Sequence, residues 1–184
     1  FHSGDKAKNV GRNSRNMEIM TKLLKLKLII FFFFLFSEKA FSGPKNIALF
    51  ATVTSSSNLN DHYDAKNAID GIIRIGEKGE WACEGSGTFW GYIRYPWIQL
   101  DWDTSQNINK IILYDRASLK THTAGGRLKF SDGSIISVNA MSNNGDAKVI
   151  TFESKHVDWV RFEVTDGVGL ELGLSEIEVF PSSK

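Results

Sequence analysis

The sequence predicts an all-β protein, an antiparallel jelly-roll β-sandwich of about eight strands. Three observations carry this prediction. Polar and apolar residues alternate with a period of two over most of the chain after residue 42, turn residues separate the alternating segments, and helical patterning is almost absent. Antiparallel strands that are covered on one side give this alternation, because successive side chains point to opposite faces of the sheet.

The first part of the chain has the organisation of a targeting segment. Three lysines within residues 22–27 give a positive flank, residues 28–36 (LIIFFFFLF) form an unbroken apolar run, and residues 40–42 (AFS) fit a small-x-small cleavage site. The run is too short for a membrane span, which needs about 20 residues. We therefore expect upstream residues and a secretory signal peptide in 1–42 and a single domain in 43–184. An uncleaved membrane anchor is the alternative.

The expected leader carries much of the positive charge. Residues 1–42 hold 8 of the 22 Lys and Arg residues and 3 of the 21 Asp and Glu residues, so 14 basic and 18 acidic residues remain and the formal net charge of 43–184 is −4. The remaining basic residues are scattered, and we expect no nucleic-acid partner. Cys83 is the only cysteine, which excludes an intramolecular disulfide framework.

Each predicted strand follows from the same alternation. In residues 157–165, for example, Val160, Phe162 and Val164 are expected to face inward, with polar residues between them. The predicted strands are residues 46–54, 97–102, 108–115, 126–131, 134–140, 147–153, 157–165 and 175–180.

Turn and helix signals lie between these strands. Asp132-Gly133 is the residue pair that a tight hairpin prefers, and residues 143–146 (NNGD) predict a second turn. Only residues 64–70 (DAKNAID) are helix-prone, over one or two turns.

Seven short motifs occur in the order that is found in galactose-binding-like domains. They are NIALFATVTSSS, AKNAIDG, EWA, PWIQLDW, INKIILYDR, LKFSDGS and GLSEIEVF. Over about residues 45–180 the chain resembles this superfamily, which includes the discoidin domains (coagulation factor type C, F5/8 type C) and related carbohydrate-binding modules. The resemblance implies a jelly-roll sandwich whose ligand depends on the individual domain.

The resemblance also implies a metal site. Many domains of the superfamily hold a structural calcium ion with loop carbonyls, the Asp of an A-x-D-G sequence and a Glu near the final strand; these positions are Asp70 and Glu176 here. Glu80 stands where the family usually has Thr or Ser. The alternative is that Asp70 only caps the turn before Gly71 and that Glu176 faces solvent.

A sugar site needs aromatic faces and planar hydrogen-bonding groups, and loops at the ends of a sandwich are where such groups gather. Arg116 follows the strand 108–115 at the position where the resembled sugar-binding modules place an arginine. Trp81 is expected to pack in the core. The predicted ligand-binding residues are Arg116, Asp115, Glu84, Trp90, Tyr92 and His122.

The sequence contains no G-x-S-x-G, H-E-x-x-H or phosphate-binding loop motif, and we do not expect an enzyme. We predict a non-catalytic, lectin-like carbohydrate-binding module, secreted or held at the cell surface or envelope, that recognises an extracellular glycan or polysaccharide. The alternatives are an adhesion domain that binds a cell-surface protein or a membrane surface, and an accessory domain of a larger glycan-active enzyme. After signal cleavage we expect no membrane contact.

Overall fold

The computed structural model of the chain describes residues 45–74, 79–89 and 92–182, together with residues 17, 20–22 and 25. The chain divides into two compact units, Phe1–Gly43 and Pro44–Lys184. In the first unit the described residues are helical, and the apolar run and cleavage site of the predicted signal peptide lie outside the described residues. None of the helices in the described part of the chain combines the length and the apolar character that a membrane crossing requires.

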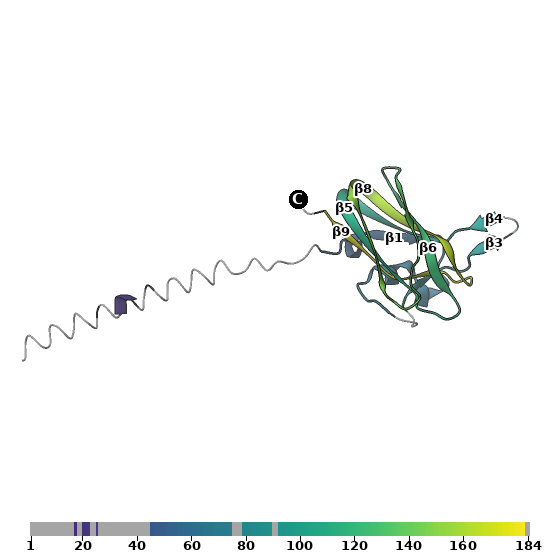
Figure 1. Cartoon of the computed structure of the whole chain (residues 1–184), viewed down its shortest axis with the longest axis horizontal. Helices are drawn as coiled ribbons and strands as arrows, with labels where there is room; N and C mark the ends of the chain where they lie inside the picture. The colour runs from purple at the N-terminus through teal and green to yellow at the C-terminus, as the bar shows by residue number, and fades with distance from the viewer. Residues whose placement is uncertain are drawn as a thin grey trace, which may run out of the picture. The chain divides into compact units, whose positions relative to one another are not determined.

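The second unit is built from strands and three short 3-10 helices (Figure 1). The helices are η1 (Ala48–Phe50), η2 (Asp61–Tyr63) and η3 (Ala65–Ile69). The strands are β1 (Thr52–Ser55), β2 (Trp81–Ala82), β3 (Gly87–Phe89), β4 (Tyr92–Arg94), β5 (Trp97–Asp115), β6 (His122–Phe130), β7 (Ile135–Val138), β8 (Ala147–Val168) and β9 (Gly173–Pro181).

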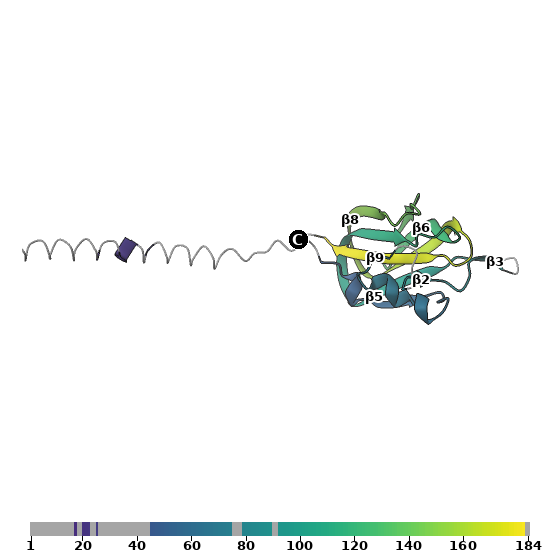
Figure 2. The same ribbon diagram turned by 90° about the horizontal axis from the view of Figure 1, so that it is seen from below.

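Two long strands, β5 and β8, belong to both layers of the sandwich. The sheet order is β2-β9-β5-β8-β6-β7, β1 pairs with the first half of β5, and every pairing is antiparallel. The register of β5 against β8 shifts between Asp101 and Gln106, and again between Ile108 and Lys110. Such bulges bend a strand and let it pass from one layer to the other. Figure 1 and Figure 2 show the resulting layers from two directions. The predicted antiparallel β-sandwich is confirmed.

The core lies between the layers and follows the predicted alternation. Ile98 and Leu100 of β5 are fully buried, and so are Val160 and Phe162 of β8, which pair with them in reverse order. Burial of each such side chain stabilises the fold by about 1.5–3 kcal/mol relative to exposure. Trp81 is also fully buried and donates its indole N–H to the carbonyl of Ser57 at 3.1 Å, as a core tryptophan should.

Several predicted strand boundaries were wrong; the strand predicted at 126–131, for example, begins at His122. The predicted strands 97–102 and 108–115 form one bent strand, and the same holds for 147–153 and 157–165. The predicted strand 46–54 begins instead as helix η1, because the side chain of Asn46 accepts hydrogen bonds from the N–H groups of Ala48 and, across the sandwich, Val179. The predicted hairpin at Asp132-Gly133 is present and joins β6 to β7.

The short strands β3 and β4 form a separate pair that projects from the body of the sandwich (Figure 1).

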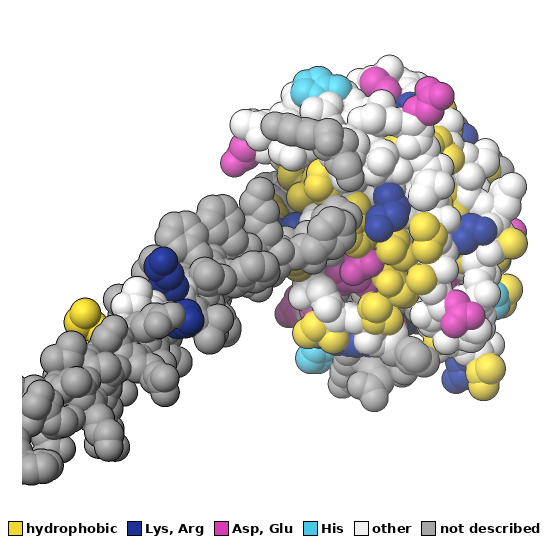
Figure 3. Space-filling model, turned by 60° about the vertical axis from the view of Figure 1, so that its left-hand side comes forward, with side chains coloured by type: hydrophobic (Ala, Val, Ile, Leu, Met, Phe, Trp, Pro, Cys, Tyr) yellow, Lys and Arg dark blue, Asp and Glu magenta, His cyan; other side chains and the backbone are white. Residues whose placement is uncertain are grey.

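One face of the surface mixes apolar and charged groups. On the face shown in Figure 3, hydrophobic side chains gather beside Lys, Arg, Asp and Glu side chains. This mixed face agrees with the scattered charges of the sequence.

Candidate functional site

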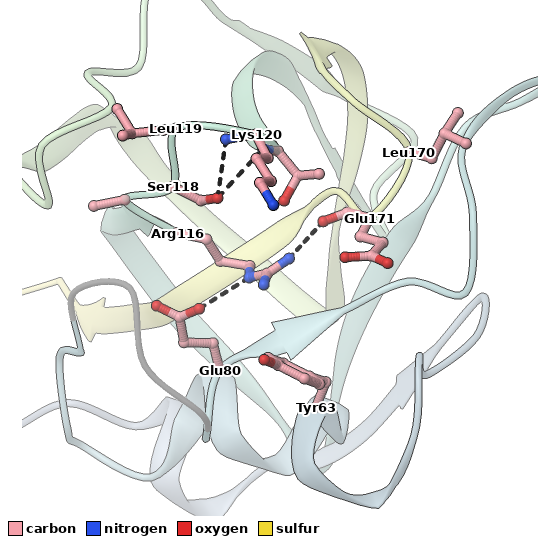
Figure 4. A pocket seen from close by; sticks show the side chains of 10 residues that line it. Tyr63, Glu80, Arg116, Ser118, Leu119, Lys120, Leu170 and Glu171 are labelled. Carbon is pink, nitrogen blue, oxygen red and sulfur yellow. Dashed lines mark hydrogen bonds and ion pairs between the residues drawn. The ribbon is translucent and has the colours of Figure 1, made fainter.

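A pocket of about 680 Å³ opens where the β5–β6 and β8–β9 loops come together. β5 ends beside the start of β9, and β8 ends beside the start of β6, so both loops lie at the same end of the sandwich. Helix η2 and the residue before β2 complete the wall (Figure 4). The lining residues are Tyr63, Glu80, Arg116, Ala117, Ser118, Leu119, Lys120, Thr121, Leu170 and Glu171.

Arg116 forms the floor of this pocket. Its Nε donates to Oε2 of Glu80 at 2.9 Å, one Nη donates to the backbone carbonyl of Glu171, and the guanidinium lies 5.1 Å from the ring centre of Tyr63. Arg116 is 6% exposed and Glu80 is 1% exposed. The guanidinium is therefore fixed in orientation, and its charge is balanced by a buried carboxylate.

Two side chains of opposite charge stand above this floor. Figure 4 shows the amino group of Lys120 and the carboxylate of Glu171 reaching into the space over Arg116 from two different loops. Apolar side chains lie at the rim, where Leu119 is fully exposed and Leu170 is 65% exposed. The pocket thus offers an anion, a cation, an aromatic ring and apolar edges to one ligand.

The β5–β6 loop is held in place from outside the pocket. The side chain of Asn143 accepts from the N–H of Ser118 at 2.9 Å and donates to the carbonyl of Ser118 at 2.8 Å. The hydroxyl of Ser118 in turn accepts from the N–H groups of Lys120 and Thr121. The turn that the sequence predicts at residues 143–146 therefore positions the loop that carries Lys120.

Asp115 lies behind the pocket rather than in it. Its side chain has no exposed surface, and Oδ1 accepts from the N–H of Thr123 at 2.8 Å. Burial raises the pKa of Asp115 to about 7. The hydroxyl of Thr123 donates to the carbonyl of Gly173, so these residues tie β5, β6 and β9 together. Asp115 was predicted to bind a ligand, but its carboxyl group lies inside the fold and not on the pocket surface.

Glu84 and His122, which were also predicted to bind a ligand, do not line the pocket. Glu84 is exposed, and its N–H donates to the hydroxyl of Ser57; it does not line the pocket. His122 begins β6, one residue beyond the lining residue Thr121, and its Nδ1 is buried without a hydrogen-bond partner among the described residues. Tyr92 begins β4, and Trp90 lies outside the described residues. Contact of these residues with a ligand stays a prediction.

The predicted metal ligands lie close to one another. Oδ1 of Asp70 accepts from the N–H of Ile72 at 2.9 Å, which is the turn cap of the alternative interpretation. Glu176 is fully buried and does not face solvent; its Oε1 accepts from the N–H of Gly71 at 3.2 Å. Oε2 has no hydrogen-bond partner among the described residues, and burial raises the pKa of Glu176 to about 8.

A nearby positive charge would stabilise the buried Oε2 of Glu176. The guanidinium of Arg74 already supplies a positive charge close to this carboxyl group. Arg74 pairs with Asp70 at 2.9 Å, and this interaction raises the pKa of the guanidinium. With Arg74 in this position the residues do not fit a calcium ion, because both oxygens of Asp70 are engaged. Within the described residues no group of three or more His, Cys, Asp or Glu side chains is arranged to hold a metal. This arrangement argues against the calcium ion that the resemblance implies at Asp70 and Glu176.

The comparisons with known proteins agree with the fold. The chitosan-binding module 1 of a chitosanase/glucanase from Paenibacillus sp. IK-5 matches with a TM-score of 0.59 and 22% identity, over 74% of this chain and 98% of that chain. The family 32 carbohydrate-binding module of NanJ from C. perfringens, in complex with galactose, matches at 0.57 and 17%, over 74% and 98%. A fucose-binding module of Streptococcus pneumoniae matches at 0.55 and 19%, over 78% and 100%. The comparison with curated proteins found no match.

These likenesses show that the domain has the same β-sandwich fold as those modules, which is the fold that the sequence motifs predict. The model of one family, described as a domain of unknown function (DUF7402), matches residues 46–180, and the chain belongs to that family.

Several pocket residues were not among the predicted site residues. Tyr63, Lys120 and Glu171 come from three separate segments, and nothing in the local sequence distinguishes them from other exposed loop residues. Glu80 did carry a signal, because it departs from the Thr or Ser that the resemblance leads one to expect. The structure shows that Glu80 is the partner of Arg116.

Proposed function

We propose that this protein is a non-catalytic glycan-binding module that acts outside the cell and takes a sugar into the pocket above Arg116. The observation that carries the proposal is the pocket itself, in which a fixed guanidinium and a tyrosine ring lie below the side chains of Lys120 and Glu171. Sugar hydroxyls are both donors and acceptors, so a carboxylate and an ammonium group that face one space can bind the same ring.

The rim supplies the apolar part of such a contact. Leu119 and Leu170 are exposed on either side of the opening and offer surface to the C–H groups of a sugar. For a single sugar site of this kind we expect dissociation constants between about 1 μM and 1 mM, which correspond to about 4–8 kcal/mol.

The structural neighbours support the glycan class without selecting one sugar. Their descriptions name chitosan, galactose and fucose as ligands on similar sandwiches. Sugars of such different charge and stereochemistry on one fold indicate that loop residues determine the ligand. In this chain the loops that line the pocket are those that carry Lys120 and Glu171.

A glycan array tests the proposal directly. The purified protein is screened, and the best ligand is titrated against Lys120→Ala and Glu171→Gln, which remove a charge from the pocket without touching the buried ion pair. Lys66→Ala is the matched control, since Lys66 is exposed on helix η3 and does not line the pocket. We expect the pocket variants to lose about tenfold or more in affinity, with the control unchanged. Failure of a folded wild-type protein to bind any glycan would overturn the proposal and favour a protein or membrane partner.

A further inference from the structure

The side chain of Arg74 gathers four oxygen atoms around one positive charge. Nη1 donates to Oδ1 of Asp70 at 3.2 Å, to the carbonyl of Ile72 at 3.3 Å and to the carbonyl of Gly79 at 2.8 Å. Nη2 lies 2.9 Å from Oδ2 of Asp70. Two carboxylate oxygens and two backbone carbonyls, from both sides of residues 75–78, thus share one guanidinium.

The same segment is fastened to β9. The backbone N–H of Arg74 donates to the hydroxyl of Ser175 at 2.7 Å, and that hydroxyl donates back to the carbonyl of Arg74 at 2.7 Å. Next to it, Gly71 donates its N–H to Glu176. The charges of Glu176 and Glu80 also act on the guanidinium of Arg74, so three carboxylates and one cation interact here.

These oxygen atoms are of the kind that a hard divalent cation takes. Calcium is bound by carboxylate and backbone carbonyl oxygens, usually six to eight of them with water included. Here the carboxylate of Asp70 and the carbonyls of Ile72 and Gly79 point at a guanidinium, and Oε2 of Glu176 is buried without a partner among the described residues. A calcium ion and a guanidinium repel each other strongly at such short range, so the two cannot share these oxygens.

We propose that Arg74 is the built-in cation of this site, that it replaces a bound metal in holding Asp70 and Gly79 together beside β9, and that removing it uncovers a binding site for a divalent cation. The oxygens of Asp70, the two loop carbonyls and the free oxygen of Glu176 become the ligands of that ion. The guanidinium is part of the chain, so the closed arrangement does not depend on the calcium concentration outside.

The test compares the wild type with Arg74→Met, which keeps an unbranched side chain close in size to the apolar stem of arginine and removes the charge and the donors. Arg161→Met is the matched control. The guanidinium of Arg161 lies 4.1 Å from the ring centre of Trp97, where β8 pairs with the first half of β5. Melting temperature is measured for each protein with a chelator and with millimolar calcium chloride, and bound calcium is measured by elemental analysis after dialysis.

We expect the wild type and Arg161→Met to melt at the same temperature with chelator and with calcium, and to carry no stoichiometric calcium. Arg74→Met should melt several degrees lower with chelator, and calcium should restore part of the loss, since a ligand that binds only the folded state stabilises it. Adding Asp70→Asn to Arg74→Met should abolish the restoration.

Two results would overturn the proposal. One is a wild-type protein that holds stoichiometric calcium or melts lower with chelator, and the other is an Arg74→Met protein whose melting temperature is the same with chelator and with calcium. If Arg74→Met is unfolded in chelator, folding on addition of calcium supports the proposal, and failure to fold in calcium overturns it.

Discussion

Arg116 and Glu80 form a buried ion pair, in which Nε of the arginine donates to the carboxylate at 2.9 Å beneath the pocket. The two residues are 36 positions apart, and burial of either charge is costly unless the charge is paired. This pair sets the shape and the electrostatic character of the pocket floor, because it fixes the guanidinium 5.1 Å from the ring centre of Tyr63.

Removing one partner of this pair should destabilise the fold more than removing both. Glu80→Leu leaves the guanidinium of Arg116 buried without its carboxylate, and we expect the free energy of unfolding to fall by about 3–5 kcal/mol. The double variant Glu80→Leu/Arg116→Met should be more stable than Glu80→Leu alone. Urea denaturation of the three proteins checks this, and a double variant that is less stable than the single one would contradict it.

Asp115 should make stability depend on pH. The folded protein keeps the proton of this carboxyl group up to about pH 7, whereas the unfolded chain releases it near its ordinary value of 3.8. Between these values the unfolded chain binds fewer protons, so stability is greatest below pH 3.8 as far as this group is concerned and falls as pH rises toward 7. The loss is up to about 1.4 kcal/mol per pH unit.

Asp115→Asn removes this titration and keeps the oxygen that accepts from Thr123. The stability of the variant, measured by urea denaturation from pH 4 to 8, should fall less with rising pH than that of the wild type. Asp166→Asn is the control, since Asp166 is exposed on β8. If Asp115→Asn and the wild type show the same slope, the buried carboxyl does not titrate in this range.

Gly173 should tolerate no side chain. A Cβ atom built there would lie 1.9 Å from the carbonyl oxygen of Trp81, because β2 and β9 approach closely at this point. Gly173→Ala should force the strands apart and lower the free energy of unfolding by about 3 kcal/mol or more. Gly133→Ala meets no atom within 4 Å and has only its φ of +83° to strain it, so its loss should be about 1–2 kcal/mol. Equal losses for the two variants would show that β2 adjusts freely.

Asn143 should control the order of the β5–β6 loop. Its two hydrogen bonds to the backbone of Ser118 are lost in Asn143→Ala, at a cost of about 1–2 kcal/mol for local opening. Hydrogen exchange at the N–H groups of Lys120 and Thr121 should then accelerate about tenfold, while exchange in the central strands β5 and β8 stays the same. Unchanged exchange at Lys120 and Thr121 would mean that the loop is held by other contacts.

The sequence was a sound guide to the fold and a partial guide to the site. Period-two alternation located the inward faces of β5, β8 and β9, because burial of one side of a strand leaves that pattern in the sequence. The alternation could not show that two predicted strands are one bent strand, since the polar residues at a bulge look like a turn.

For the site, Arg116 is the one predicted ligand-binding residue that lines the pocket within the part of the chain that the structure describes. Its partner Glu80 is the residue before β2. The contact between the two residues therefore depends on how β2 pairs with β9. Lys120 and Glu171 meet because two loops converge, which is a tertiary relationship. The ion pair between Asp70 and Arg74, in contrast, joins positions i and i+4. The spacing of the two charges in the sequence could have predicted it.

The most direct measurement is an NMR titration of the labelled protein with the best glycan from the array, followed through backbone amide shifts. The account predicts that the largest shifts fall on Tyr63, residues 116–121 and residues 170–171, around the pocket above Arg116. Shifts confined to the exposed face of the sheet around Trp97 and Arg161, with the pocket residues unmoved, would contradict it.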